Sequence, residues 1–198
     1  TLCGFPRSSV FRYDGEAFHP WEPFAQIPLT SSTYVGLVFD FLGKTYMSGT
    51  LRDPLTGGFA SFLRFNGSSW EHVPGWNTLA AIKDINIRND TLYVAGAFRH
   101  ATGGPGDLVA AFNGETWNDM MGGLAHPPAL ASGAALDLEW FHGDLYVCGL
   151  FHRAGGVPVE GIAKWDGTRW CGLPGDFRGP NGAQTTSLYD MTIWRNSL

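Results

Sequence analysis

Two kinds of ionisable side chain recur at fixed places in this sequence. Three aspartates each lie eight residues before a leucine, namely Asp84, Asp137 and Asp190. Four basic residues each lie three positions after a glycine, namely Arg7, Arg52, Arg99 and His152. If these sets gather at one place, they form a charged site for a cation or polar ligand, or they pair with one another and hold neighbouring elements together. Both interpretations stay open from the sequence.

Signals for other chemistry are weak. The three aspartates lack the interleaved oxygen ligands of a calcium loop, and the six histidines and three cysteines do not follow zinc-ligand spacing. The sequence also has no nucleophile elbow and no phosphate-binding glycine loop. We therefore expect no catalytic residue, no metal and no cofactor. A glycosidase or lyase is the least favoured interpretation, because no pair of carboxylates has a distinctive setting.

The composition indicates a turn-rich all-β protein. Of 198 residues, 27 are glycine and eight are tryptophan, while only 16% are charged. Glycine, aromatic and β-branched residues favour strands and tight turns over a helical bundle. The formal net charge of −5 excludes the basic excess that binds a phosphate backbone, so we expect no nucleic-acid partner. No apolar run approaches the roughly 20 residues of a membrane span, so no membrane insertion is expected.

An internal repeat organises the chain. Its first landmark is an aromatic residue, then Asp-Gly or Asn-Gly, two further residues and a second aromatic, as in Tyr13–Phe18, Phe65–Trp70, Phe112–Trp117 and Trp165–Trp170. Its second landmark is a short run that ends in glycine, at Gly4, Gly49, Gly96 and Gly149. Two landmarks that stay in step through four units indicate structural repeats of about 50 residues.

Each unit is predicted to form four short antiparallel strands. Turns are expected at Asn89-Asp90, Asn113-Gly114, His142-Gly143 and Asp166-Gly167. Asn-Gly and Asp-Gly favour two-residue type I′ hairpins, because both central residues there need a positive φ. No amphipathic helical pattern is present.

Repeated meanders of this size favour a β-propeller, in which similar sheets stack radially as blades. We expect a single domain over residues 1–198 with about four blades, one of them shared between the N- and C-termini. The expected blades are 31–73, 77–124, 132–177, and residues 185–198 combined with 1–26. In the shared blade, residues 187–194 would pair with residues 1–5. A two-sheet sandwich is the alternative fold, and the chain could also be a fragment of a longer repeat protein.

Aromatic residues at one fixed position of each repeat suit packing between neighbouring sheets. We expect Trp70, Trp117 and Trp170 to be buried in this way. The alternative is that the aromatic residues stack on sugar rings.

The stretch Leu145–Phe151, followed by Ala154-Gly155-Gly156-Val157 and Gly161–Trp170, resembles a known class of secreted repeat. It is similar to the propeller-type repeats of bacterial cell-surface proteins that the type IX system of the Bacteroidetes exports, and to those of fungal Rax-type polarity markers. The resemblance implies a secreted or cell-surface location and a binding or structural role without enzyme chemistry.

The favoured function is therefore a non-catalytic extracellular recognition or scaffold module, and a carbohydrate-binding lectin-type propeller is the alternative. The expected partner is a protein or a glycan at the cell surface. The recurring aspartates and basic residues are the candidate ligand-binding residues. The chain is expected to be a closed monomer or a pair of half-rings.

Overall fold

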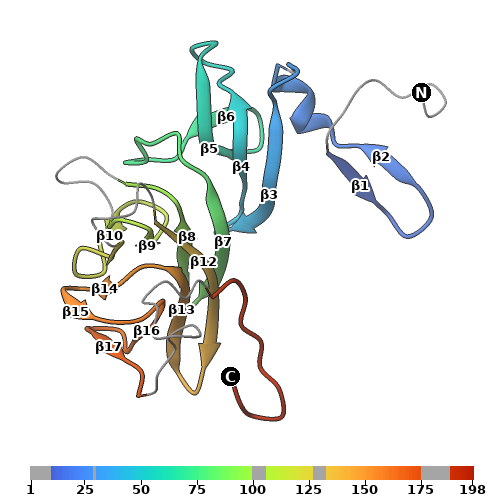
Figure 1. The fold of residues 1–198 in the computed structure, drawn as a ribbon. Helices are drawn as coiled ribbons and strands as arrows, with labels where there is room; N and C mark the ends of the chain where they lie inside the picture. The colour runs from blue at the N-terminus through green and yellow to red at the C-terminus, as the bar shows by residue number, and fades with distance from the viewer. Residues whose placement is uncertain (1–9, 29, 100–105, 127–132, 175–187) are drawn as a thin grey trace. The chain divides into compact units, whose positions relative to one another are not determined.

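The computed structural model describes residues 10–28, 30–99, 106–126, 133–174 and 188–198. These residues form an all-β structure of antiparallel sheets, as the composition predicts (Figure 1). Within the described part, the one helical element is the short 3-10 helix η1 (Glu22–Gln26), and no helix has the length and hydropathy to cross a membrane. The chain divides into two compact units, residues 1–73 and 74–198.

The first unit contains a two-stranded and a four-stranded sheet. Strands β1 (Phe11–Tyr13) and β2 (Phe18–Pro20) pair with each other. The larger sheet is a meander of β3 (Tyr34–Phe41), β4 (Lys44–Arg52), β5 (Phe59–Phe65) and β6 (Trp70–His72). Its core includes the buried residues Phe24, Ile27, Met47, Leu51, Leu63 and Trp70.

The second unit contains two further four-stranded meanders. The first consists of β7 (Ile82–Arg88), β8 (Thr91–Gly96), β9 (Val109–Phe112) and β10 (Trp117–Asn118). The second consists of β12 (Ala134–Phe141), β13 (Asp144–Leu150), β16 (Ile162–Trp165) and β17 (Trp170–Gly172). Strand β12 packs against β7 and β8 (Figure 1). The predicted four-stranded meanders in 77–124 and 132–177 are confirmed.

A small sheet links these two meanders. Strand β11 (Leu124–Ala125) follows the first meander and pairs with β14 (Arg153–Ala154), which lies within the second. Strand β15 (Val157–Pro158) completes this sheet. The sequence predicts only a connection there, because two-residue strands carry no periodicity.

The hairpin turns occur where the sequence predicts them, but their types differ from the prediction. Three turns between the first and second strands of a meander have positive φ at both central residues, as type I′ turns require: Leu42-Gly43, Asn89-Asp90 and His142-Gly143. The Arg195-Asn196 turn within the isolated Trp194–Ser197 bridge has the same property. The Asn-Gly and Asp-Gly turns have a positive φ only at the glycine, as at Gly114 and Gly167. The type I′ assignment of the Asn113-Gly114 and Asp166-Gly167 turns is therefore wrong.

These turns are four-residue loops that the first side chain organises. Asn113 Oδ1 accepts hydrogen bonds from the backbone N–H groups of Glu115 and Thr116, at 3.0 and 2.8 Å. Asp14, Asn66 and Asp166 accept the same pair of bonds in their own loops. The side-chain oxygen accepts hydrogen bonds from the backbone N–H groups that the turn would otherwise leave unpaired. This arrangement is an Asx-turn.

The landmark glycines face a bulge in the first strand of each meander. The strand register shifts between Val35 and Leu37, between Ile82 and Asp84, and between Ala135 and Asp137. A Cβ at Gly149 would lie 2.2 Å from the carbonyl oxygen of Ala134, and Gly49 and Gly96 have equally close carbonyl neighbours at 2.0 and 2.3 Å. Glycine recurs there because the bulged backbone occupies the space of a side chain.

The regular spacing of the tryptophans along the chain has a structural reason. Trp70 and Trp170 are buried, with 1% and 3% of their surface exposed, which confirms the prediction for these two. Trp117 is only partly buried, because it also borders a pocket. Each indole N–H donates to a backbone carbonyl of the segment that precedes its own meander: Trp70 to Pro23, Trp117 to Pro74 and Trp170 to Met120.

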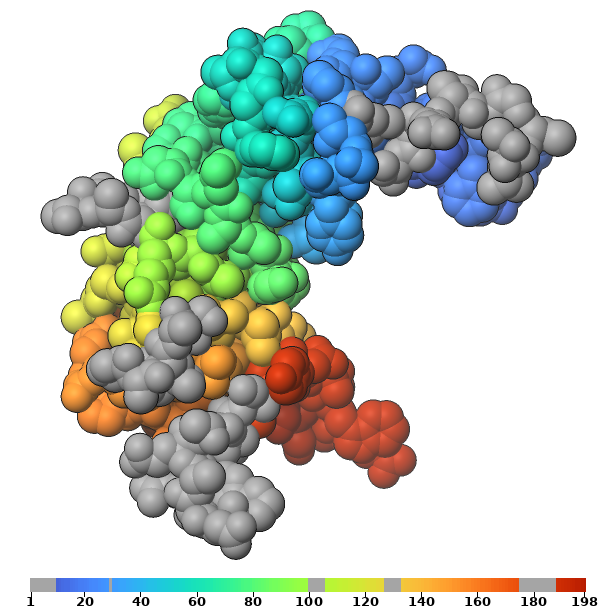
Figure 2. All heavy atoms as spheres, turned by 45° about the horizontal axis from the view of Figure 1, so that its top comes forward, coloured from blue at the N-terminus to red at the C-terminus, as the bar shows by residue number. Residues whose placement is uncertain are grey.

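The C-terminal residues 188–198 lie against the sheet that contains β12 and β13 (red in Figure 2). The strand expected at residues 187–194 is not observed in its described part, where residues 188–193 form no ladder with any other described segment. Only an isolated bridge between Trp194 and Ser197 forms. The expected partner, residues 1–5, lies outside the described residues.

Candidate functional site

Two of the recurring aspartates accept hydrogen bonds from the backbone of the following repeat. Asp84 lies on β7 directly after the bulge, and its Oδ2 accepts a hydrogen bond from the backbone N–H of Leu138 at 2.8 Å. Asp137 occupies the same place on β12, and its Oδ2 accepts from the N–H of Met191 at 2.8 Å. In both cases the donor is the residue that follows the next aspartate of the series, so one interaction repeats at two successive junctions.

The environment of Asp84 changes its protonation. Burial raises the pKa of Asp84 to about 6, although two backbone N–H groups that bond to it act in the opposite direction. A hydrogen bond to the Asp137 carboxyl and its charge raise this pKa further. A proton held between the two carboxyl groups relieves their repulsion.

Cys148 lies close to the same acidic groups. Burial, together with the charges of Asp137, Asp190 and Asp84, raises the pKa of this thiol to about 12. Its Sγ donates a hydrogen bond to the carbonyl oxygen of Leu188 at 3.5 Å. The thiol therefore stays protonated and is not a nucleophile at neutral pH.

The basic set has other partners in the described part of the chain. Arg52 donates to the carbonyl oxygen of Gly57 and lies over the ring of Phe59. His152 Nδ1 lies 2.8 Å from the carbonyl oxygen of Ala125, Arg99 is exposed, and Arg7 is outside the described residues. Among residues that the structure describes, no ion pair joins Asp84, Asp137 or Asp190 to a basic residue of the set, and no three His, Cys, Asp or Glu side chains form a metal-binding group. Ligand binding by these residues stays a prediction.

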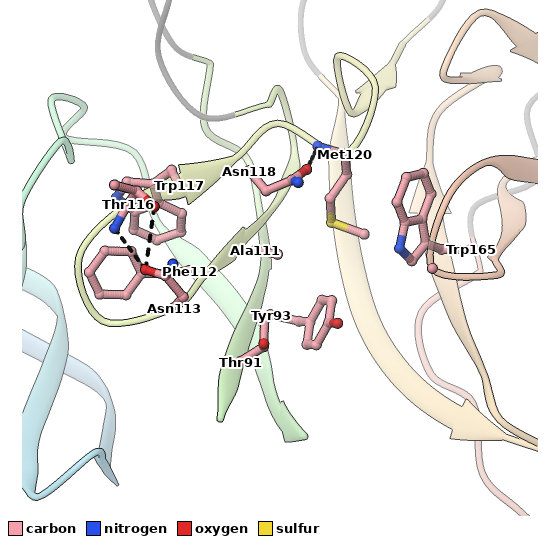
Figure 3. A pocket seen from close by; sticks show the side chains of 11 residues that line it. Thr91, Tyr93, Ala111, Phe112, Asn113, Thr116, Trp117, Asn118, Met120 and Trp165 are labelled. Carbon is pink, nitrogen blue, oxygen red and sulfur yellow. Dashed lines mark hydrogen bonds between the residues drawn. The ribbon is translucent and has the colours of Figure 1, made fainter. Parts of the chain in front are cut away.

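The second unit has a pocket that sequence reasoning missed. It has a volume of about 350 Å³ and lies beside the outer strands of the β7–β10 sheet, with one wall from the β12–β17 sheet (Figure 3). Its lining residues are Thr91, Tyr93, Ala111, Phe112, Asn113, Thr116, Trp117, Asn118, Met120, Trp165 and Gly167. None of these described residues carries a charge at neutral pH.

Several polar groups in this pocket keep hydrogen-bonding capacity. Asn118 Oδ1 accepts from the backbone N–H of Met120 at 2.7 Å, which leaves its amide N–H₂ without a partner among the described residues. Burial raises the pKa of the Tyr93 phenol, so its hydroxyl stays protonated. In Figure 3 the Tyr93 ring extends from β8 toward the side of the pocket that Trp165 forms.

A comparison of the repeats explains why a pocket opens in this sheet. Ala111 pairs with Tyr93 on one side and Asn118 on the other. The residue with the same pairing in the β3–β6 sheet is Arg64, which lies between Tyr46 and Glu71. Arg64 Nε lies 2.6 Å from Glu71 Oε1, and Lys44 joins the same carboxylate at 3.1 Å.

The β12–β17 sheet also carries an ion pair at this place. Lys164 takes the position of Ala111, since it pairs with Tyr146 and Cys171. Its Nζ lies 2.6 Å from Asp144 Oδ2. Small neutral residues at Thr91, Ala111 and Asn118 therefore leave space where the other two sheets hold charged side chains. Aligning the four repeats by position could have revealed this difference from sequence alone.

No family model matches this chain, and a search of curated proteins found no match.

Proposed function

We propose that this chain is a non-catalytic recognition or scaffold module, secreted or displayed at the cell surface, and built as a β-propeller. The observation that carries the proposal is the repeated junction. The bonds from Leu138 to Asp84 and from Met191 to Asp137 span the same 54 residues and use the same atoms. A constant step between successive repeats is the relation that radial stacking requires.

The chemistry of the aspartates supports a structural use for them. Their carboxylate oxygens accept backbone N–H bonds between repeats, which satisfies buried acceptors and fixes the spacing of the sheets. A carboxylate that holds the scaffold together serves a binding protein well, because rigid junctions present surface loops in a fixed arrangement.

Closure of the ring is part of the proposal. Residues 187–194 would supply the first strand and residues 1–5 the second strand of a blade that β1 and β2 complete. An unpaired edge exposes N–H and C=O groups, and pairing of the two termini would satisfy both edges.

Light scattering coupled to gel filtration, with small-angle X-ray scattering on the same sample, tests the architecture. A closed monomer is expected to have the mass of one chain and the scattering of a compact disc. A dimer would instead indicate two paired half-rings. An extended monomer would contradict the propeller.

Binding without turnover tests the function. The immobilised chain would be offered a panel of extracellular polysaccharides and cell-surface protein fractions. We expect saturable binding of at least one component, and mass spectrometry of the released component should show an unchanged mass. Cleavage of the bound component would contradict the non-catalytic proposal.

A further inference from the structure

We propose that the pocket of the β7–β10 sheet binds a neutral sugar residue of a glycan. This inference rests on the proposed recognition function and gives it a ligand class. The pocket combines four aromatic side chains with hydroxyl and amide groups, and none of its described lining residues is charged. Its volume of about 350 Å³ suits a single small ring, because it lies near the lower limit of ligand sites, which span roughly 300–1,000 Å³.

Trp165 shows that the pocket is a built site. Only 6% of this residue is exposed, and none of the hydrogen bonds among the described residues uses its indole N–H. Figure 3 shows the indole nitrogen on the side that faces the pocket. The indole N–H groups of Trp70 and Trp170 donate to backbone carbonyls, whereas the buried N–H of Trp140 has no partner among the described residues. An indole N–H that borders a pocket and makes no other hydrogen bond is suited to a ligand acceptor.

The contrast between repeats supports the same conclusion. Two of the three meanders fill this place with a charged side chain at Arg64 or Lys164, each in an ion pair. In the remaining meander, β7–β10, Ala111 takes the place of that charged residue, and Asn118 takes the place of Glu71. The pocket therefore results from specific substitutions within a repeated framework, and the same substitutions remove its charge.

The ligand class follows from the lining. A sugar ring offers apolar C–H faces to aromatic rings and hydroxyl groups to amide and phenol groups. Tyr93, Trp117 and Trp165 supply the rings, and the Tyr93 hydroxyl and Asn118 amide supply polar partners. An anionic ligand would find no cation among the lining residues, and a cationic ligand would find no carboxylate.

The test uses the full chain and defined sugars. A glycan array identifies candidates, and the matching methyl glycoside is then titrated while the indole N–H resonance of Trp165 is followed by NMR. We expect that resonance to shift saturably. Tyr93→Phe removes one hydroxyl and should weaken binding by roughly tenfold. Tyr146→Phe is the matched control, because it changes the equivalent tyrosine of the next meander and should leave affinity unchanged.

A second variant fills the pocket with the charged residue types that another sheet of this chain carries at the equivalent positions. Ala111→Arg with Asn118→Glu recreates the ion pair that the β3–β6 sheet carries at Arg64 and Glu71, and should abolish sugar binding while the thermal melt stays close to that of the parent chain. If no sugar on the array binds, if binding survives this double variant, or if the Trp165 resonance does not move, the pocket proposal is overturned.

These outcomes differ from failure of the proposed function. A chain that binds an extracellular component unchanged but ignores every sugar would keep its recognition role and lose this site. A sugar that binds in the pocket and is cleaved would keep the site and contradict the non-catalytic role.

Discussion

Asp84 and Asp137 connect successive repeats through backbone N–H groups. A buried carboxylate can stay ionised when donors surround it, but the hydrogen bond between the two carboxyl groups favours one shared proton. The recurrence of aspartate at this position therefore serves the junction first. Its protonation state is coupled to the stability of that junction.

Asp84→Asn tests this coupling. The pKa of Asp84 is about 6 in the folded protein, above its ordinary value of 3.8. A raised folded-state pKa stabilises the fold below the unfolded pKa, and this stabilisation is lost as pH rises through the folded pKa. Asparagine keeps an oxygen acceptor for Leu138 and cannot ionise. We expect the variant to be at least as stable as the parent at about pH 7.5 and to lose this advantage at about pH 4.5, measured by urea denaturation.

Asp90→Asn is the matched control. Asp90 is exposed in a type I′ turn, and asparagine tolerates the same backbone conformation. Its effect on the free energy of unfolding should be similar at both pH values. An equal pH dependence for the Asp84 and Asp90 variants would show that Asp84 does not share a proton in the fold.

Trp170 fixes a junction through both its ring and its indole N–H. Trp170→Phe leaves the carbonyl of Met120 without its donor and should lower the free energy of unfolding by about 1–3 kcal/mol. Trp170→Ala also removes the buried ring, so we expect a loss of about 3–5 kcal/mol. Trp117→Ala should cost less, because Trp117 is only partly buried. Equal losses for Trp117→Ala and Trp170→Ala in urea denaturation would contradict this ranking.

The turn between β3 and β4 carries a residue that does not suit its backbone conformation. Leu42 has a φ of 47°, a conformation that is unfavourable for leucine, and 52% of its surface is exposed. The neighbouring repeat places Asn89 at the equivalent turn position. The meander tolerates this strain because β3 and β4 pair from Phe41 and Lys44 next to the turn as far as Tyr34 and Thr50.

Leu42→Asn should therefore stabilise the protein. It creates an Asn-Gly pair with Gly43, which is the preferred pair for a type I′ turn, and we expect a gain of about 0.5–1 kcal/mol in thermal or urea denaturation. Leu55→Asn is the control, since Leu55 is also exposed but has no positive φ. A gain of the same size at Leu55 would mean that reduced surface hydrophobicity, and not turn strain, is responsible.

Gly149 is needed for the bulge that aims Asp137. A methyl group there would lie 2.2 Å from the carbonyl oxygen of Ala134, so the bulge has to move. We expect Gly149→Ala to cost about 2–3 kcal/mol. Gly172→Ala is the control in the same sheet, because its nearest neighbour would be 3.6 Å away. Similar melting temperatures for the two variants would contradict the role of the bulge.

At the scale of the whole molecule, the proposed closure of the repeats depends on the C-terminal segment. Removing residues 185–198 would delete the Met191 donor to Asp137 and the contact between His142 and Asn196. We expect the melting temperature to fall by several degrees, since about 1 kcal/mol corresponds to roughly 2–4 °C for a chain of this size. Full-length Trp194→Ala is the control, because Trp194 is 68% exposed and should leave the melting temperature nearly unchanged. An unchanged melt after truncation would argue against closure.

The sequence determined the repeats, the strands of the four-stranded meanders and the positions of their turns. Alternating apolar residues define a strand locally, and Asn89-Asp90 or Asp166-Gly167 interrupts the pattern wherever the chain reverses. It also indicated that Asp84 and Asp137 are equivalent, because their distances from the other landmarks are the same. These features depend on residues that are close in the chain.

Only the tertiary structure decided the partners. The Asn113 side chain, and not the backbone alone, shapes its turn, and this depends on which way its oxygen points. Asp84 bonds to a backbone N–H 54 residues away rather than to a basic side chain, since a buried main-chain donor at the junction also needs an acceptor. The pocket brings Ala111 and Asn118 from one sheet together with Trp165 from the next. A site of this kind depends on how two sheets pack, which no local pattern encodes.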